Sequence, residues 1–116
     1  MNRFSETVDI LGTQWKIKVR KQSEDKILQT VEGYADRTTR EIVICDASDD
    51  TDYGDYAAFQ RKVLRHEIIH AFLFESGLGE CAHYERQDAD HPEMLVDWMA
   101  MQFVKISNAF AEAGAI

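Results

Sequence analysis

Two histidines and a glutamate in one short stretch have the types and spacing that metal chemistry needs. His66 and His70 are four residues apart, and Glu67 follows the first histidine directly, in the sequence HEIIH. On a helix, residues four apart lie on one face, so both imidazoles can reach the same ion. The pattern therefore indicates a zinc site with His66 and His70 as ligands and Glu67 as a base beside the water on the metal.

Such a site needs a third ligand, and several residues downstream have a suitable side chain. Glu93 is the first choice, because it begins a predicted second helix that can pack against the first. Asp97, one turn later, could accept the free ring N–H of a ligating histidine and fix its tautomer. His91 is the second choice and His83 the third, both in the connection before that helix.

The elements that must position these residues are two helices. Residues 56–76 contain no glycine or proline, and Gly77 follows their end, which predicts a helix from about Asp55 to Ser76 that is stopped by that glycine. Pro92 suits the first turn of the second helix, which we expect to reach about Ala113. We expect both helices to turn apolar stripes inward. The expected inward residues are Phe59, Val63, His66, His70 and Leu73 in the first helix, and Leu95, Met99, Phe103, Ile106 and Phe110 in the second, with Met94 and Met101 as further core residues.

The first third of the chain predicts strands. Residues 15–20 alternate apolar and basic side chains, as a strand with one buried face does. Residues 33–36 and 40–45 are expected to form a hairpin whose second strand is the more hydrophobic. If that strand, 40–45, lies at a sheet edge beside the metal helix, it could hold a peptide by strand addition. An acidic loop, 46–55, fails the calcium-loop pattern and is expected to cap the helix that follows.

The predicted fold class is α+β: a single domain, residues 1–116, with a small antiparallel or mixed sheet of about three strands packed on two main helices. The 116-residue length suits one modest core, and 45% hydrophobic with 29% charged residues is typical of a globular domain. A net charge of −8 argues against nucleic acid or an anionic membrane as the main partner. Cys45 and Cys81 do not resemble a disulfide framework, and the expected compartment is the cytoplasm.

The helix motif resembles that of a known class of enzymes. His-Glu-x-x-His on one helix and Glu93-x-x-x-Asp97 on the next are similar to the Glu-zincin metallopeptidases. The longer segment HEIIHAFLFESGL, with Val96-Asp97-Trp98, resembles small zinc-peptidase-like proteins of phages and prophages, related in plan to the ImmA/IrrE-type peptidases. A more distant likeness, to SprT-type peptidases, rests on His91-Pro92-Glu93 and would make His91 the third ligand.

The resemblance implies a zinc peptidase with a zincin-like fold over roughly residues 33–107. It implies His66, His70 and Glu93 as ligands, Glu67 as the base and Asp97 as the partner of a ligating histidine. The substrate would be a peptide or protein. The alternative is a non-catalytic protein-binding domain of mobile-element origin, in which the metal staples the two helices. Glu67 favours catalysis, because a structural site has no use for a base beside the metal.

Overall fold

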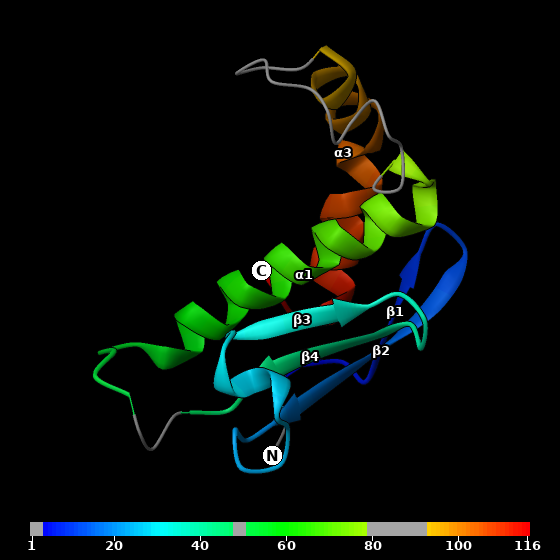
Figure 1. Ribbon diagram of the computed structural model, residues 1–116. Helices are drawn as coiled ribbons and strands as arrows, with labels where there is room; N and C mark the ends of the chain where they lie inside the picture. The colour runs from blue at the N-terminus through cyan, green and yellow to red at the C-terminus, as the bar shows by residue number, and fades with distance from the viewer. Residues whose placement is uncertain (1–3, 48–50, 79–92) are drawn as a thin grey trace.

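The computed structural model describes residues 4–47, 51–78 and 93–116 (Figure 1). Within residues 93–100 it describes the backbone and the side chains of Leu95, Trp98 and Met99. A four-stranded mixed sheet carries two long helices on one face, so the predicted α+β class is confirmed. The sheet order is β1-β2-β4-β3, where β1 pairs antiparallel with β2, β2 parallel with β4, and β4 antiparallel with β3. The strands are β1 (Thr7–Ile10), β2 (Thr13–Arg20), β3 (Gly33–Asp36) and β4 (Glu41–Cys45).

The metal-motif helix is α1 (Tyr56–Ser76), and its predicted ends are confirmed. Asp55 is the N-cap residue, and its carboxylate accepts a hydrogen bond from the amide of Ala58 at 3.0 Å. Gly77 ends the helix with a left-handed backbone at φ 82°, a conformation that a side chain would disfavour. The second helix, α3 (Glu93–Ala113), crosses α1 on the far side of the view in Figure 1.

The core lies between the sheet and the two helices. From α1, the residues Leu64, Ile68 and Phe72 pack on the sheet, and α3 adds Ile106 and Ala109. Strands β1, β2 and β4 each contribute the residues of one face to this layer. These residues are Val8, Ile10, Trp15, Ile17, Ile42 and Ile44. Because each of these positions alternates with a polar or outward-facing residue, the strands have the period-two pattern of a sheet covered mainly on one side.

The expectation that the motif histidines face the interior is wrong. His66 is exposed and His70 is half-buried, whereas the face centred on Ile68 is buried against the sheet. At 3.6 residues per turn, each histidine lies about 160° round the helix from Ile68. The branched and aromatic side chains take the contact with the sheet, and the imidazoles remain at the solvent side of α1.

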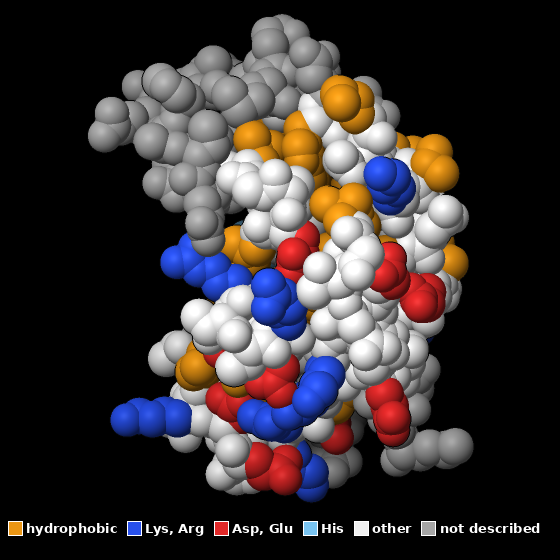
Figure 2. All heavy atoms as spheres, turned by 90° about the vertical axis from the view of Figure 1, so that its right-hand side faces the viewer, with side chains coloured by type: hydrophobic (Ala, Val, Ile, Leu, Met, Phe, Trp, Pro, Cys, Tyr) orange, Lys and Arg blue, Asp and Glu red, His pale blue; other side chains and the backbone are white. Residues whose placement is uncertain are grey.

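The expected core stripe of α3 is only partly correct. Ile106 is buried and Phe110 is partly buried against the core, but Phe103 is 60% exposed and Met101 is 76% exposed. Val104 is also exposed, at 68%. Figure 2 shows hydrophobic side chains on the upper part of the molecule, where α3 rises above the sheet. Within the described part of the chain, no helix is long and apolar enough to cross a membrane.

The condition for strand addition at residues 40–45, a place at the edge of the sheet, is not met. Strand β4 lies inside the sheet between β2 and β3, and Ile42, Val43 and Ile44 are at most 1% exposed. Both faces of β4 are buried, because Ile42 and Ile44 pack beneath the helices while Val43 and Cys45 pack with Leu28 on the other side. The strand at the edge beside α1 is β3, which is short and half-buried along its length.

A hydrogen-bonded carboxylate on the other face of the sheet holds the loop that precedes β3. Asp25 is 8% exposed and accepts hydrogen bonds from the Tyr34 hydroxyl at 2.5 Å, the Ile27 amide at 3.0 Å and the Arg20 guanidinium at 3.2 Å. The Tyr34 hydrogen bond is the largest cause that holds the pKa of Asp25 below its usual value. This network fixes the short 3-10 helix η1 (Ile27–Gln29) against β3 and β4.

We expect Tyr34→Phe to lower the free energy of unfolding at neutral pH by about 1.5 kcal/mol, because it removes a hydrogen bond to a charged acceptor. A lowered folded pKa stabilises the fold above the unfolded value of about 3.9, and this contribution disappears as pH falls through the folded pKa. The difference between Tyr34→Phe and wild type should therefore shrink as pH falls below about 4. Urea unfolding at neutral and at acid pH measures this difference, and Tyr53→Phe at an exposed tyrosine is the matched control. An equal difference at both pH values would mean that the charge of Asp25 is not the cause.

Candidate metal centre

Helix α1 brings the two motif histidines together. The Nε2 atoms of His66 and His70 are 3.1 Å apart, and the ring centroids are 4.8 Å apart. Two nitrogens bound to one tetrahedral zinc at about 2.0–2.1 Å would be about 3.3 Å apart. The separation of the two nitrogens, which is that of a hydrogen bond between the rings, is therefore close to the separation that one zinc ion requires.

Glu67 lines the same cavity as His66, and its carboxyl group is in a poorly hydrated position. The residue is 7% exposed, and desolvation by burial raises the pKa of its carboxyl group to about 7. Among the described residues, no charge or hydrogen bond counters this effect. A carboxyl group whose pKa is near neutrality can both take and return a proton at neutral pH, which is the property of a general acid–base residue.

The surroundings of His70 favour the form that binds metal. Desolvation by burial lowers the pKa of His70, and the neighbouring His66 acts in the same direction. The ring of His70 also lies nearly parallel to that of Phe74, with the centroids 6.3 Å apart. A neutral imidazole keeps a lone pair for a metal, so this environment prepares a ligand and does not oppose one.

A cleft opens between α1 and the start of β3, and the motif faces it. A cavity of about 330 Å³ is lined by both His66 and Glu67. Gly33 allows β3 to approach α1 closely: a Cβ atom there would lie 2.7 Å from Val63 Cγ1 and 3.0 Å from the Val43 carbonyl oxygen. Gly33 was not among the predicted site residues, although a glycine in a strand often marks a close approach of another backbone.

The third ligand stays a prediction. Glu93 and Asp97 belong to α3, but their side chains, together with all of His83 and His91, lie outside the described residues. Within the described residues, no three His, Cys, Asp or Glu side chains form a group that could hold a metal. The structure thus brings two of the predicted ligands together, and Glu67 lines the same cavity as His66.

Contacts between the helices show from which side α3 approaches α1. The Trp98 indole donates to the Ser76 hydroxyl at 3.2 Å, and the Arg65 guanidinium donates to the Ala115 carbonyl at 2.7 Å. The two helices are therefore antiparallel, with α3 along the side of α1 that carries Arg65 and Ser76. Helical geometry puts this side about 100–120° round α1 from the histidines. A ligand from the start of α3 must consequently reach past the C-terminal half of α1.

We expect Glu93→Ala to lose stoichiometric zinc and His91→Ala to keep it, since Glu93 is the preferred ligand. Asp97→Asn should weaken zinc binding about 10- to 100-fold, as loss of a hydrogen bond to a ligating histidine does. Zinc titration against a competing chelator measures all three variants. The reverse result, with zinc lost only in His91→Ala, would assign the third position to His91.

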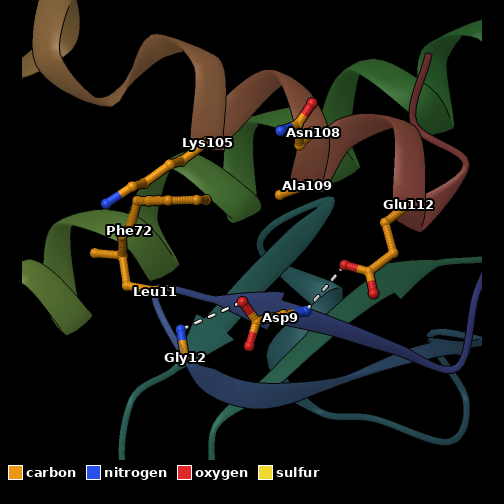
Figure 3. A pocket seen from close by; sticks show the side chains of 8 residues that line it. All are labelled: Asp9, Leu11, Gly12, Phe72, Lys105, Asn108, Ala109 and Glu112. Atoms are coloured by element: carbon orange, nitrogen blue, oxygen red, sulfur yellow. Dashed lines mark hydrogen bonds between the residues drawn. The ribbon is translucent and has the colours of Figure 1, made fainter.

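A second cavity, of about 510 Å³, lies between the β1–β2 turn and α3 (Figure 3). Its acidic residues accept hydrogen bonds from the backbone: the Asp9 carboxylate from the Gly12 amide at 3.3 Å, and the Glu112 carboxylate from the Asp9 amide at 3.2 Å. The second of these bonds ties α3 to strand β1. Of the predicted site residues that the structure describes, His66, Glu67 and His70, none lines this cavity.

Comparison with known proteins gives this chain no relative. No family model, no curated protein and no solved structure matches it. Membership of the Glu-zincins therefore stays a prediction.

Proposed function

We propose that the protein is a zinc-dependent metallopeptidase in which His66 and His70 bind the metal and Glu67 is the general base. The observation that carries the proposal is the approach of the two Nε2 atoms to 3.1 Å beside a cleft that Glu67 also lines. Glu93 is the proposed third ligand and Asp97 the proposed partner of a ligating histidine. The resemblance of HEIIH and its following residues to Glu-zincins supports the same assignment.

The residues of α1 have separate roles in the proposed reaction. A bound zinc ion would supply Lewis-acid chemistry, which lowers the pKa of water to about 7. Glu67 accepts the proton of the attacking water and delivers it to the amine that leaves, so one carboxylate acts first as base and then as acid. Its burial keeps bulk water away from the proton that it carries.

Among the described strands, β3 lies at one edge of the sheet, and this is the edge that we propose for the substrate backbone. The Cys45 amide donates to the Glu32 carbonyl at 2.9 Å, which makes these two residues a hydrogen-bonded pair of the antiparallel ladder. Pairs alternate in such a ladder, so Gly33 and Ala35, opposite Ile44 and Ile42, direct their N–H and C=O groups away from β4. An extended peptide could add to these groups as a fifth strand alongside α1.

The opposite edge of the sheet does not offer the same surface. On β1, the outward amide of Asp9 is engaged by Glu112 of α3, and the Ser5 amide donates to the Ala113 carbonyl at 3.1 Å. Both contacts use backbone or side-chain groups of α3 to protect the edge from pairing. Strand addition is therefore proposed at β3, next to the cleft, and not at β1.

A second candidate function is a metal-stapled protein-binding domain without catalysis. The exposed side chains of Met101, Phe103 and Val104 on α3 favour it, because clustered apolar residues on a surface often mark a protein interface. In that case Glu67 could be changed without loss of function, and a partner chain would bind the Glu67→Gln variant as tightly as the wild type.

The test of the peptidase proposal is cleavage of a peptide library by zinc-loaded wild type and by Glu67→Gln. We propose peptides or proteins as the substrates and expect no nucleic acid or membrane partner, given the net charge of −8. The cytoplasm remains the expected compartment. Cleavage by the wild type that is absent in Glu67→Gln would support the proposal, and cleavage by neither would favour the binding domain.

A further inference from the structure

The cavity beside the metal motif has walls that are mainly apolar. Val31, Phe59 and Val63 line it together with Gly33, while His66 and Glu67 form its end toward the motif. Its volume of about 330 Å³ is at the lower limit of the pockets that bind small molecules, about 300–1,000 Å³. A cavity of this size is suited to one or two side chains of a bound chain and not to a large ligand.

The cavity adjoins the proposed base directly. Val63 precedes Glu67 by four residues and Phe59 precedes Val63 by four, so these side chains form one row along α1 that ends at the carboxylate. On the other side of the cavity stands Gly33, whose backbone groups point out from the edge of β3. A peptide that pairs with Gly33 would therefore have an alternate side chain over this row, within one helical turn of Glu67.

The charged residues at the cavity do not select a charged ligand. Glu32 and Lys62 both line it, and their opposite charges offset each other. Phe59 is held in place by stacking on Tyr53, with ring centroids 4.5 Å apart, so the floor of the cavity is an ordered aromatic surface. Gly33 keeps the cavity open at its narrow side, because a side chain there would meet Val63.

We propose that this cavity is a specificity pocket that receives a large apolar side chain of the substrate, such as Leu or Phe. The substrate class is then an extended peptide segment with such a residue next to the bond that is cleaved. This inference rests on the proposed function, because it gives the cleft beside Glu67 a substrate. Val31, Phe59 and Val63 are the residues that determine the preference.

The preference can be measured with a peptide series that varies one residue among Leu, Phe, Ala, Asp and Lys at each position. Burial of a large apolar side chain in a fitted pocket should raise kcat/KM about 10- to 100-fold over Ala at one position. Phe59→Ala and Val31→Asp should each reduce this preference by about 10-fold or more. Phe103→Ala and Val104→Asp make the same changes at exposed positions of α3, and these two variants should keep the full preference for apolar peptides.

A binding measurement separates this inference from the peptidase proposal. The Glu67→Gln variant, loaded with zinc, should bind the Leu and Phe peptides more tightly than the Ala peptide, and Phe59→Ala in that background should remove the difference. If an active wild type cleaves apolar and Ala peptides with equal kcat/KM, the proposal of a specificity pocket is wrong, whereas the peptidase proposal is still supported. If the wild type cleaves nothing, selective binding would still support the pocket, and unselective or absent binding would overturn it.

Discussion

Replacement of Glu67 by glutamine is expected to reduce peptide hydrolysis by about 10²–10⁴-fold while zinc content and fold remain unchanged. The amide is nearly the size of the carboxylate and fits the same buried position, but it cannot accept a proton from water. General-base assistance is typically worth that factor. The loss should appear mainly in kcat, with KM little altered, because the proposed substrate contacts lie on β3 and in the apolar cavity.

The control for this experiment is Glu6→Gln, an equal change at an exposed glutamate far along the sequence from α1. It should retain full activity and full zinc content. Zinc stoichiometry and a thermal melt must accompany each rate, so that a loss of metal or fold is not mistaken for a loss of the base. Equal cleavage by wild type and Glu67→Gln would remove Glu67 from the mechanism.

Removal of zinc is expected to lower the melting temperature of the wild type by roughly 10 °C. A ligand that binds only the native state at about 100 times its Kd stabilises that state by about 2.7 kcal/mol. For a domain of this size, such a change corresponds to a shift of that order in Tm. His70→Ala should melt like the chelated wild type and should contain no stoichiometric zinc, because it lacks one of the two assembled ligands.

The matched measurement is chelation of His70→Ala itself, which should leave its melting temperature unchanged. A melting curve of the wild type that does not respond to chelation would mean that the centre is not coupled to the fold. That outcome would also exclude the alternative of a metal-stapled binding domain, since a staple must stabilise the structure that it joins.

Local signals in the sequence were sufficient to predict most of the elements. The absence of breakers from Tyr56 to Ser76, the capping carboxylate of Asp55 and the glycine at 77 together define α1 in both the sequence and the structure. Each of these signals acts within one or two turns of the chain. Strand β1 was missed because Thr7–Ile10 is only four residues long and becomes a strand by pairing with β2.

The arrangement of the elements depended on contacts that sequence patterns do not contain. The hydrophobicity of Ile42–Ile44 showed that β4 is buried, but the place of β4 between β2 and β3 follows from pairing with two separate strands. Likewise, His66 and His70 share a helix face, but which face meets the sheet was decided by the packing of Leu64, Ile68 and Phe72. The exposure of Phe103 on α3 has the same origin, because the buried contacts of that helix are made by Ile106, Ala109 and Ala113.

Local spacing predicts only the part of the candidate centre that lies on one helix, α1. The spacing of HEIIH is sufficient to bring two imidazoles close together, and the Nε2 atoms of His66 and His70 are 3.1 Å apart. The third ligand depends on how α3 and the connection before it approach α1, which no local spacing specifies. Gly33 and the apolar cavity were missed for the same reason, since they arise where β3 meets α1.

The most direct test of the central claim is peptide cleavage by the zinc-loaded wild-type protein. A broad peptide library should be incubated with the metal-loaded protein and with the chelated protein, and the products read by mass spectrometry. We predict defined cleavage products that appear with zinc, disappear on chelation and return when zinc is added back. The absence of any product from the zinc-loaded wild type across the library would contradict the assignment of this protein as a peptidase.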